Sequence, residues 1–164
     1  MTKSFQLTLT ADIATIATHN IICVTGTDTG IGKTVVTGLL AKELANHGMV
    51  VTQKWVQSGD LDEPDISTHD TISNLSYDRK YNDDRQVYSF KDPVSPHLAA
   101  RLANQTIKPG LLKSATHRLA DAFDTVLVET SGGIMVPLSE SVTTGDLVAD
   151  MKLATIVVVP NKLG

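Results

Sequence analysis

The sequence predicts an α/β domain in which a mainly parallel sheet lies between two layers of helices. Short apolar runs rich in β-branched residues alternate with longer stretches of helical spacing, which is typical of strand–helix–strand units. The first apolar run leads through a glycine-rich turn directly into a helical stretch. Polar residues suited to chemistry stand just after the apolar runs, where open α/β sheets bind their ligands.

In the first half of the chain, strands are expected at residues 21–25 and 49–56. A helix with an apolar stripe joins them and ends near Asn46-His47-Gly48, a typical stop signal. The second strand is expected to be buried on both faces, as parallel strands usually are. A polar loop at 57–64 and a short helix at 65–75 follow.

In the second half, residues 76–92 are expected to be irregular or to contain a short strand near 86–90. Ser95-Pro96 begins a helix that runs through Asn104, with serine as the cap and proline in the first turn. The remaining elements are a helix from Lys108-Pro109 to about Phe123, a strand at 124–129, a helix at 143–152 and a strand at 154–159.

Size and composition indicate a soluble protein with one core. The chain has 164 residues, of which 41% are hydrophobic and 20% charged. A formal net charge of −4 argues against nucleic-acid binding, which needs a basic face. No apolar run is long enough to span a membrane, and residues 1–20 lack the apolar block of a secretory signal. The single cysteine, Cys23, fits a buried position in a reducing cytoplasm.

Two segments follow from this reading: an N-terminal extension at residues 1–20, with a weak strand pattern at 5–9, and an α/β domain at 21–164.

The domain is organised around Gly26-Thr27-Asp28-Thr29-Gly30-Ile31-Gly32-Lys33-Thr34. This is the strand–loop–helix setting of a phosphate-binding loop, or P-loop, whose backbone N–H groups and helix N-terminus attract phosphate. Lys33 would contact the terminal phosphates and the Thr34 hydroxyl would bind Mg²⁺. The usual spacing wants glycine at position 27, so a glycine-rich turn without a nucleotide is the alternative.

Lys54 and Glu129 stand at the ends of two predicted strands. A lysine within an apolar strand is costly unless its ammonium reaches water or an anion, so Lys54 either lies at an edge or faces phosphate. Glu129 either makes a cap or an ion pair, or holds Mg²⁺ as strand-end acids do in phosphate-loop enzymes. Ser95-Pro96-His97 is explained by helix capping, with ligand contact by Ser95 or His97 as the alternative. Asp70 is one of several acids in a polar segment and is not singled out by pattern alone.

Together these motifs resemble the dethiobiotin synthetase family. The resemblance rests on the loop in its Gly-Thr-Asp-Thr form, Lys54 with Ser58-Gly59, Ser95-Pro96-His97, Glu129 with Gly132-Gly133, and Lys162-Leu163-Gly164. It implies a three-layer P-loop NTPase-like fold with a mainly parallel sheet, shortened at its C-terminal end. It also implies a cytoplasmic enzyme that converts ATP, carbon dioxide and 7,8-diaminononanoate into dethiobiotin, with Mg²⁺ as cofactor, and a homodimer if a further C-terminal part is present.

The resemblance also implies roles for particular residues. Lys33 and Lys54 would stabilise phosphoryl and carbamate charge, Ser58 would contact the diamine, and Thr34, Asp70 and Glu129 would hold Mg²⁺. The residues expected to line the ATP are Gly30, Ile31, Gly32, Lys33, Thr34, Val35, Asp70, Glu129, Thr130, Ser131 and Gly132. Thr130-Ser131 stands where the family has Gly-Ala, so a side chain is present where backbone would lie near substrate. Two other functions stay open: a nucleotide-switch ATPase of the partitioning type, and a binding module without activity.

Overall fold

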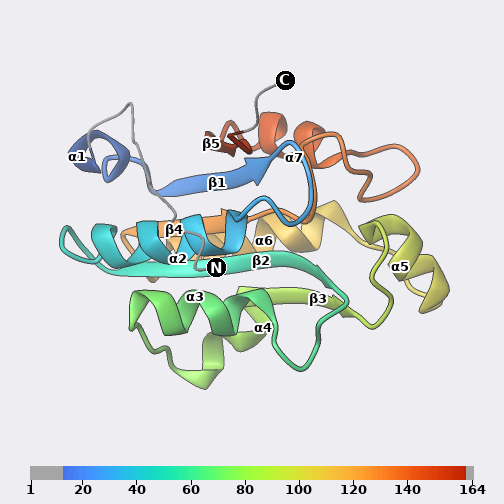
Figure 1. Cartoon of the computed structure of the whole chain (residues 1–164), viewed down its shortest axis with the longest axis horizontal. Coiled ribbons are helices and arrows are strands. Elements are labelled where there is room, and N and C mark those ends of the chain that lie inside the picture. Colours follow the sequence, from blue (N-terminus) through green and yellow to red (C-terminus); the bar gives the residue numbers. More distant parts are fainter. Residues whose placement is uncertain (1–12, 162–164) are drawn as a thin grey trace.

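A computed structural model describes residues 13–161. Within this range the chain forms a five-stranded parallel sheet of order β3-β2-β4-β1-β5, with helices on both faces (Figure 1). This confirms the predicted fold class. Three expectations concern residues outside the described range: the rest of the N-terminal extension, the strand at 5–9 and the Lys162-Leu163-Gly164 segment.

The strands begin and end close to where the sequence places them. They are β1 (Ile21–Gly26), β2 (Val50–Ser58), β3 (Gln86–Phe90), β4 (Thr125–Glu129) and β5 (Ala154–Val158). β2 is buried along nearly its whole length, as expected for an inner strand. Because all pairs are parallel, the carboxyl ends of the five strands meet at one edge, where the chemistry-bearing residues are concentrated.

The helices are α1 (Ile13–Ile16), α2 (Lys33–Leu44), α3 (Asp65–Ser73), a 3₁₀ turn η1 (Arg79–Tyr81), α4 (Asn82–Arg85), α5 (Pro96–Leu102), α6 (Pro109–Ala120) and α7 (Thr144–Asp150). Residues 76–92 are more ordered than expected, because Asp78 caps η1 by accepting a hydrogen bond from the Lys80 N–H. α1 lies in the segment expected as an extension, and Ile13 and Ile16 pack against the core. Among the described residues, no helix has the length and apolarity that crossing a membrane requires.

Alternation along the strands divides the core between the two faces. Ile22 and Val24 of β1 pack with Leu40 and Leu44 of α2 on one face, whereas Cys23 belongs to the opposite face. That second face is covered by α5, α6 and α7, whose apolar residues share one cluster with Cys23. Burial raises the pKa of the Cys23 thiol to about 12, as expected for a structural cysteine.

α2 and α3 approach each other closely on the first face. A Cβ added at Gly38 of α2 would lie 2.8 Å from the Cβ of Ile72 on α3. The absence of a side chain at Gly38 therefore sets the distance between the two helices. Since α2 begins at the phosphate loop, this contact places α3 beside the loop (Figure 1).

Candidate active site

The loop between β1 and α2 has the backbone conformation of a phosphate cradle. Gly30 and Gly32 have φ values of 70° and 99°, which residues with a side chain adopt only with strain. At Gly30 an added Cβ would meet nothing within 4 Å, so the backbone angle alone explains the glycine. No side chain caps α2, because Gly32 occupies the cap position. The N–H groups of the first helical turn are thus available to an anion.

Lys33 curves back over the loop. Its Nζ donates a hydrogen bond to the Asp28 carbonyl oxygen at 2.7 Å, and the residue is 5% exposed. Burial, and next the nearby Lys54 ammonium, lower the pKa of Lys33. The two ammonium groups repel each other, and a bound phosphate would offset this repulsion.

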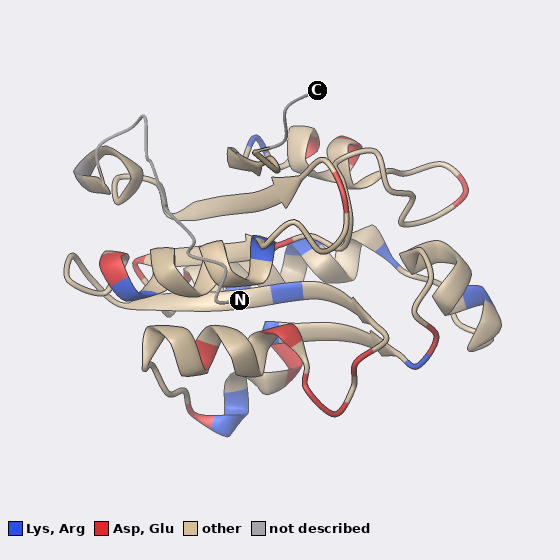
Figure 2. Ribbon diagram, in the orientation of Figure 1, with Lys and Arg blue, Asp and Glu red and all other residues tan. Residues whose placement is uncertain are grey.

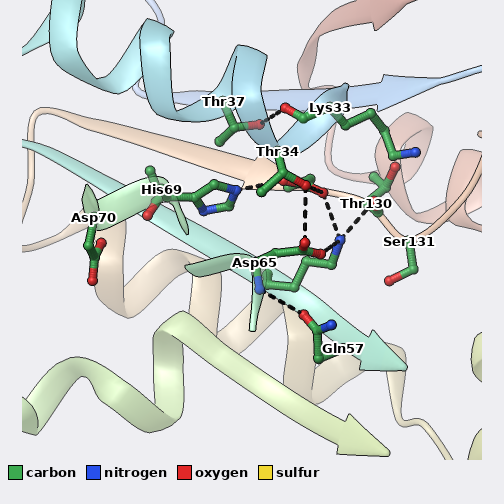
Figure 3. Close-up of polar contacts among 12 residues, drawn as sticks. Lys33, Thr34, Thr37, Gln57, Asp65, His69, Asp70, Thr130 and Ser131 are labelled. Atoms are coloured by element: carbon green, nitrogen blue, oxygen red, sulfur yellow. Dashed lines mark hydrogen bonds and ion pairs between the residues drawn. The ribbon is translucent and has the colours of Figure 1, made fainter. Parts of the chain in front are cut away.

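Three side chains that carry oxygen atoms able to bind a metal converge beside the loop, each from a different element. Figure 3 labels two of them, Thr34 and Asp65. The Thr34 hydroxyl lies 3.1 Å from Asp65 Oδ1 and 3.1 Å from Glu129 Oε1. Thr34 comes from the first turn of α2, Asp65 from the first turn of α3 and Glu129 from the end of β4. The packing of α3 against α2 thus brings the Asp65 carboxylate to the Glu129 carboxylate.

Lys54 forms ion pairs with both carboxylates. Its Nζ lies 2.6 Å from Asp65 Oδ2 and 2.8 Å from Glu129 Oε1, and the residue is 4% exposed. Burial by itself would lower the pKa of Lys54, but the two carboxylates outweigh it and raise the pKa. Burial would raise the pKa of Glu129, but Lys54 and His69 lower it to about 2. Lys54 is therefore a charged residue of the site and not a solvent-exposed edge lysine.

Asp70, expected among the Mg²⁺ and ATP ligands, does not join this group. Its carboxylate receives hydrogen bonds from Arg85 Nη1 at 3.1 Å and Nη2 at 2.5 Å. Asp70 is five positions after Asp65, which on a helix is a rotation of roughly 140°. Asp70 thus pairs with the buried Arg85. In Figure 3 its side chain lies away from Asp65 and Thr34. The structure thus places Asp65, and not Asp70, beside Thr34 and Lys54.

The converging residues line an open cavity of about 520 Å³ at the carboxyl edge of the sheet. This is within the usual range of roughly 300–1,000 Å³ for small-molecule sites. Of the residues expected at the site, the lining contains Gly30, Gly32, Lys33, Thr34, Lys54, Ser58, Glu129, Ser131 and Gly132. It does not contain Ile31, Val35, Asp70 or Thr130.

Ser95 also lines the cavity, and the structure revises the reason for its presence. No side-chain hydrogen bond caps α5, although Pro96 does begin the helix as expected. The Ser95 hydroxyl lies 3.3 Å from His97 Nδ1 instead. Ser95 lines the cavity and could contact a ligand there. His97 is not part of the lining.

Thr130 and Ser131 differ in orientation. The Thr130 side chain is 1% exposed, and its hydroxyl donates to Thr25 Oγ1 at 2.9 Å, so it lies beside β1 and does not enter the cavity. The backbone carbonyl of Thr130 accepts a hydrogen bond from Lys54 at 3.4 Å. Ser131 does line the cavity and donates to the Val56 carbonyl. The threonine in place of glycine is accommodated without filling the ligand space.

Pattern reasoning missed several residues that the structure brings to the site, among them Asp65, His69 and Gln57. Gln57 Oε1 accepts a hydrogen bond from the Asp65 N–H at 3.2 Å, which ties the start of α3 to β2. The signal for Asp65 was present: an acid directly after Pro64, in the first turn of a helix. His69 is one helical turn later, which places it on the same face.

The donors suit Mg²⁺. A hydroxyl and two carboxylates are hard oxygen ligands, and Mg²⁺ is usually held by one or two carboxylates, waters and substrate phosphates. The described part of the chain contains no group of three or more His, Cys, Asp and Glu side chains placed to hold a metal by themselves.

Lys and Arg are spread over several helices and loops in this range (Figure 2).

Comparison with known proteins agrees with this geometry. A family described as an AAA domain matches residues 20–164. An "ATP-dependent dethiobiotin synthetase BioD 2" from Haemophilus ducreyi is 40% identical over 147 residues, covering 88% of this chain and 70% of that protein. A protein of the same name from Haemophilus influenzae is 36% identical, covering 88% and 77%, and the "ATP-dependent dethiobiotin synthetase BioD" of Chlorobaculum tepidum is 37% identical, covering 88% and 62%. The chain belongs to the ATP-dependent dethiobiotin synthetase family.

Proposed function

We propose that this chain is an ATP-dependent dethiobiotin synthetase, a ligase that forms carbon–nitrogen bonds. The observation that carries the proposal is the convergence of Thr34, Asp65, Glu129 and Lys54 beneath a phosphate loop, inside one cavity. The names of the relatives supply the reaction. The substrates would be ATP, carbon dioxide and 7,8-diaminononanoate.

The reaction would proceed in three steps. One amine of the diamine adds to the carbon of carbon dioxide and loses a proton, which gives a carbamate. An oxygen of the diamine's carbamate attacks the γ-phosphorus of ATP, so that an O–P bond forms and the bond to ADP breaks. The second amine then attacks the carbamate carbon, loses its proton, and expels phosphate as the ring closes. The phosphoryl transfer brings two anions together, so cationic side chains and correct positioning must provide most of its acceleration.

The chain's residues would divide this work. Lys33 and the N–H groups at the start of α2 would bind the β- and γ-phosphates, and Lys54 would offset charge on the carbamate and the transferred phosphoryl group. Thr34, Asp65 and Glu129 would hold Mg²⁺, which when bound would neutralise phosphate charge. Ser58, at the end of β2, lines the cavity and would contact the diamine.

Isotope incorporation and phosphate release test the proposal together. We expect phosphate release from ATP to require both the diamine and bicarbonate, and ¹³C from labelled bicarbonate to appear in dethiobiotin by mass spectrometry. Release that ignores the diamine, with no labelled product, would refute the proposal and favour a nucleotide-switch ATPase. Sedimentation would test the homodimer, and cell fractionation the cytoplasmic location.

A further inference from the structure

His69 is buried behind the cavity, where it contacts Glu129 but does not itself line the cavity. The residue is 0% exposed, and its Nε2 lies 2.6 Å from Oε2 of Glu129, which is 1% exposed (Figure 3). It comes from the second turn of α3, one turn after Asp65. One helix therefore contributes both a carboxylate to the donor group and a contact to the carboxylate opposite.

The two oxygens of Glu129 have separate partners. Oε1 faces Thr34 and Lys54, at 3.1 Å and 2.8 Å, whereas Oε2 contacts His69. A carboxylate that is held at only one oxygen can rotate about its terminal bond. Contacts at both oxygens fix the plane of the group and direct Oε1 toward Thr34.

The hydrogen in the contact belongs to the histidine. Glu129 Oε1 already accepts hydrogen bonds from the Thr34 hydroxyl and the Lys54 ammonium, as an ionised carboxylate does, and such a group can only accept. His69 Nε2 must therefore donate. The other ring nitrogen, Nδ1, is buried and has no hydrogen-bond partner among the described residues. The contact with Glu129 is therefore the hydrogen bond that the ring makes among the described residues.

We propose that His69 is a positioning residue that holds Glu129 in the orientation needed to bind the metal–nucleotide complex. The inference rests on the proposed function, because it takes Glu129 as a Mg²⁺ ligand. A core histidine needs only some hydrogen-bond partner, and His69 uses the carboxylate that faces the phosphate loop. Its effect should therefore appear in metal binding and not in stability alone.

Two substitutions separate these roles. His69→Gln keeps an N–H donor that can reach Oε2, whereas His69→Leu has a similar apolar bulk and no donor. Binding of ADP is measured by calorimetry without metal and with Mn²⁺, and free Mn²⁺ is followed by electron paramagnetic resonance. We expect His69→Leu to weaken Mn²⁺–ADP binding by about 10- to 100-fold, the usual cost of losing a partner of a metal ligand.

The other comparisons make the outcome decisive. Metal-free ADP binding should change less than about threefold in both variants, because loop and lysine contacts remain, and His69→Gln should keep Mn²⁺–ADP binding within about threefold of the unaltered chain. If His69→Leu does not fold, His69→Asn replaces it, since its amide is one carbon shorter and falls short of Oε2. Equal Mn²⁺–ADP binding by all forms, equal loss in both variants, or no effect of Mn²⁺ on the unaltered chain would overturn the proposal.

This test does not depend on turnover. A chain that makes no dethiobiotin but shows the expected Mn²⁺–ADP pattern would contradict the proposed reaction and leave the role of His69 standing. A chain that makes dethiobiotin but binds Mn²⁺–ADP equally well with leucine at position 69 would do the opposite.

Discussion

Lys54 and Glu129 are register partners on the adjacent parallel strands β2 and β4, and their side chains meet at 2.8 Å. Side chains of paired residues lie on the same face of a sheet. Both therefore face α2 and α3, and the sheet itself fixes their separation. The cation and one acid of the site are thus set by strand register, whereas Asp65 depends on the docking of a helix.

Replacing Lys54 by alanine should damage both catalysis and folding. The change leaves Asp65 and Glu129 close together without their cation, and breaking a buried ion pair costs about 3–5 kcal/mol. We expect phosphate release to fall by orders of magnitude and the free energy of unfolding in urea, followed by circular dichroism, to drop by roughly 3 kcal/mol or more. Lys113→Ala is the control, because its pair with Asp150 is exposed and should contribute less than about 1 kcal/mol. Equal stability losses in the two variants would contradict this account.

Asp65→Asn should weaken metal binding, whereas Asp70→Asn should lower stability. Asp65→Asn removes a carboxylate that lies next to the Thr34 hydroxyl, so Mg²⁺-dependent nucleotide binding should weaken by at least about tenfold. The second leaves the buried Arg85 without its carboxylate, so stability should fall by about 1–3 kcal/mol while metal binding persists. Calorimetry with Mg²⁺–ADP and urea unfolding distinguish the two. Loss of metal binding in Asp70→Asn but not in Asp65→Asn would restore the expectation from sequence.

Glu129 should make the fold sensitive to acid. Its pKa is lowered from 4.5 to about 2 in the folded chain, so as pH falls the unfolded chain takes up the proton first. The stabilisation is complete above about pH 4.5 and disappears as pH falls toward about 2, a change of roughly 3 kcal/mol. Unfolding in urea between about pH 6 and about pH 3 should show a shallower pH dependence for Glu129→Gln than for the unaltered chain. Glu43→Gln, at an exposed position of α2, should leave the pH dependence as it was.

Gly38→Ala should disturb the site from a distance. The added methyl group would lie 2.8 Å from Ile72 Cβ, and overpacking of this kind costs about 1–3 kcal/mol. By displacing α3 from α2, it should also weaken Mg²⁺–ADP binding, since α3 carries Asp65. Gly110→Ala on α6 is the matched control: its Cβ meets nothing within 4 Å, so stability should hold or rise slightly. A Gly38→Ala chain as stable as Gly110→Ala would show that the helices adjust freely.

Much of the fold and half of the site could be predicted because they depend on local pattern. The loop, Lys54 and Glu129 follow apolar runs whose ends are visible in the sequence, and parallel strands align those ends. Asp65 and His69 could not be chosen in this way. Their direction depends on the rotation of α3, which is set by packing against Gly38 and by the attraction of Arg85 for Asp70. The resemblance implies Asp70, which lies on the same helix but pairs with Arg85.

The chain's one tryptophan offers a fluorescent reporter that the ligand does not touch. Trp55 directly follows Lys54, so its ring lies on the opposite face of β2, is 1% exposed, and donates to Thr116 of α6 at 3.0 Å. Its emission should shift to longer wavelength when that face opens to water and stay unchanged when nucleotide enters the cavity. Unfolding and occupancy can therefore be observed separately in the same sample, without an attached dye.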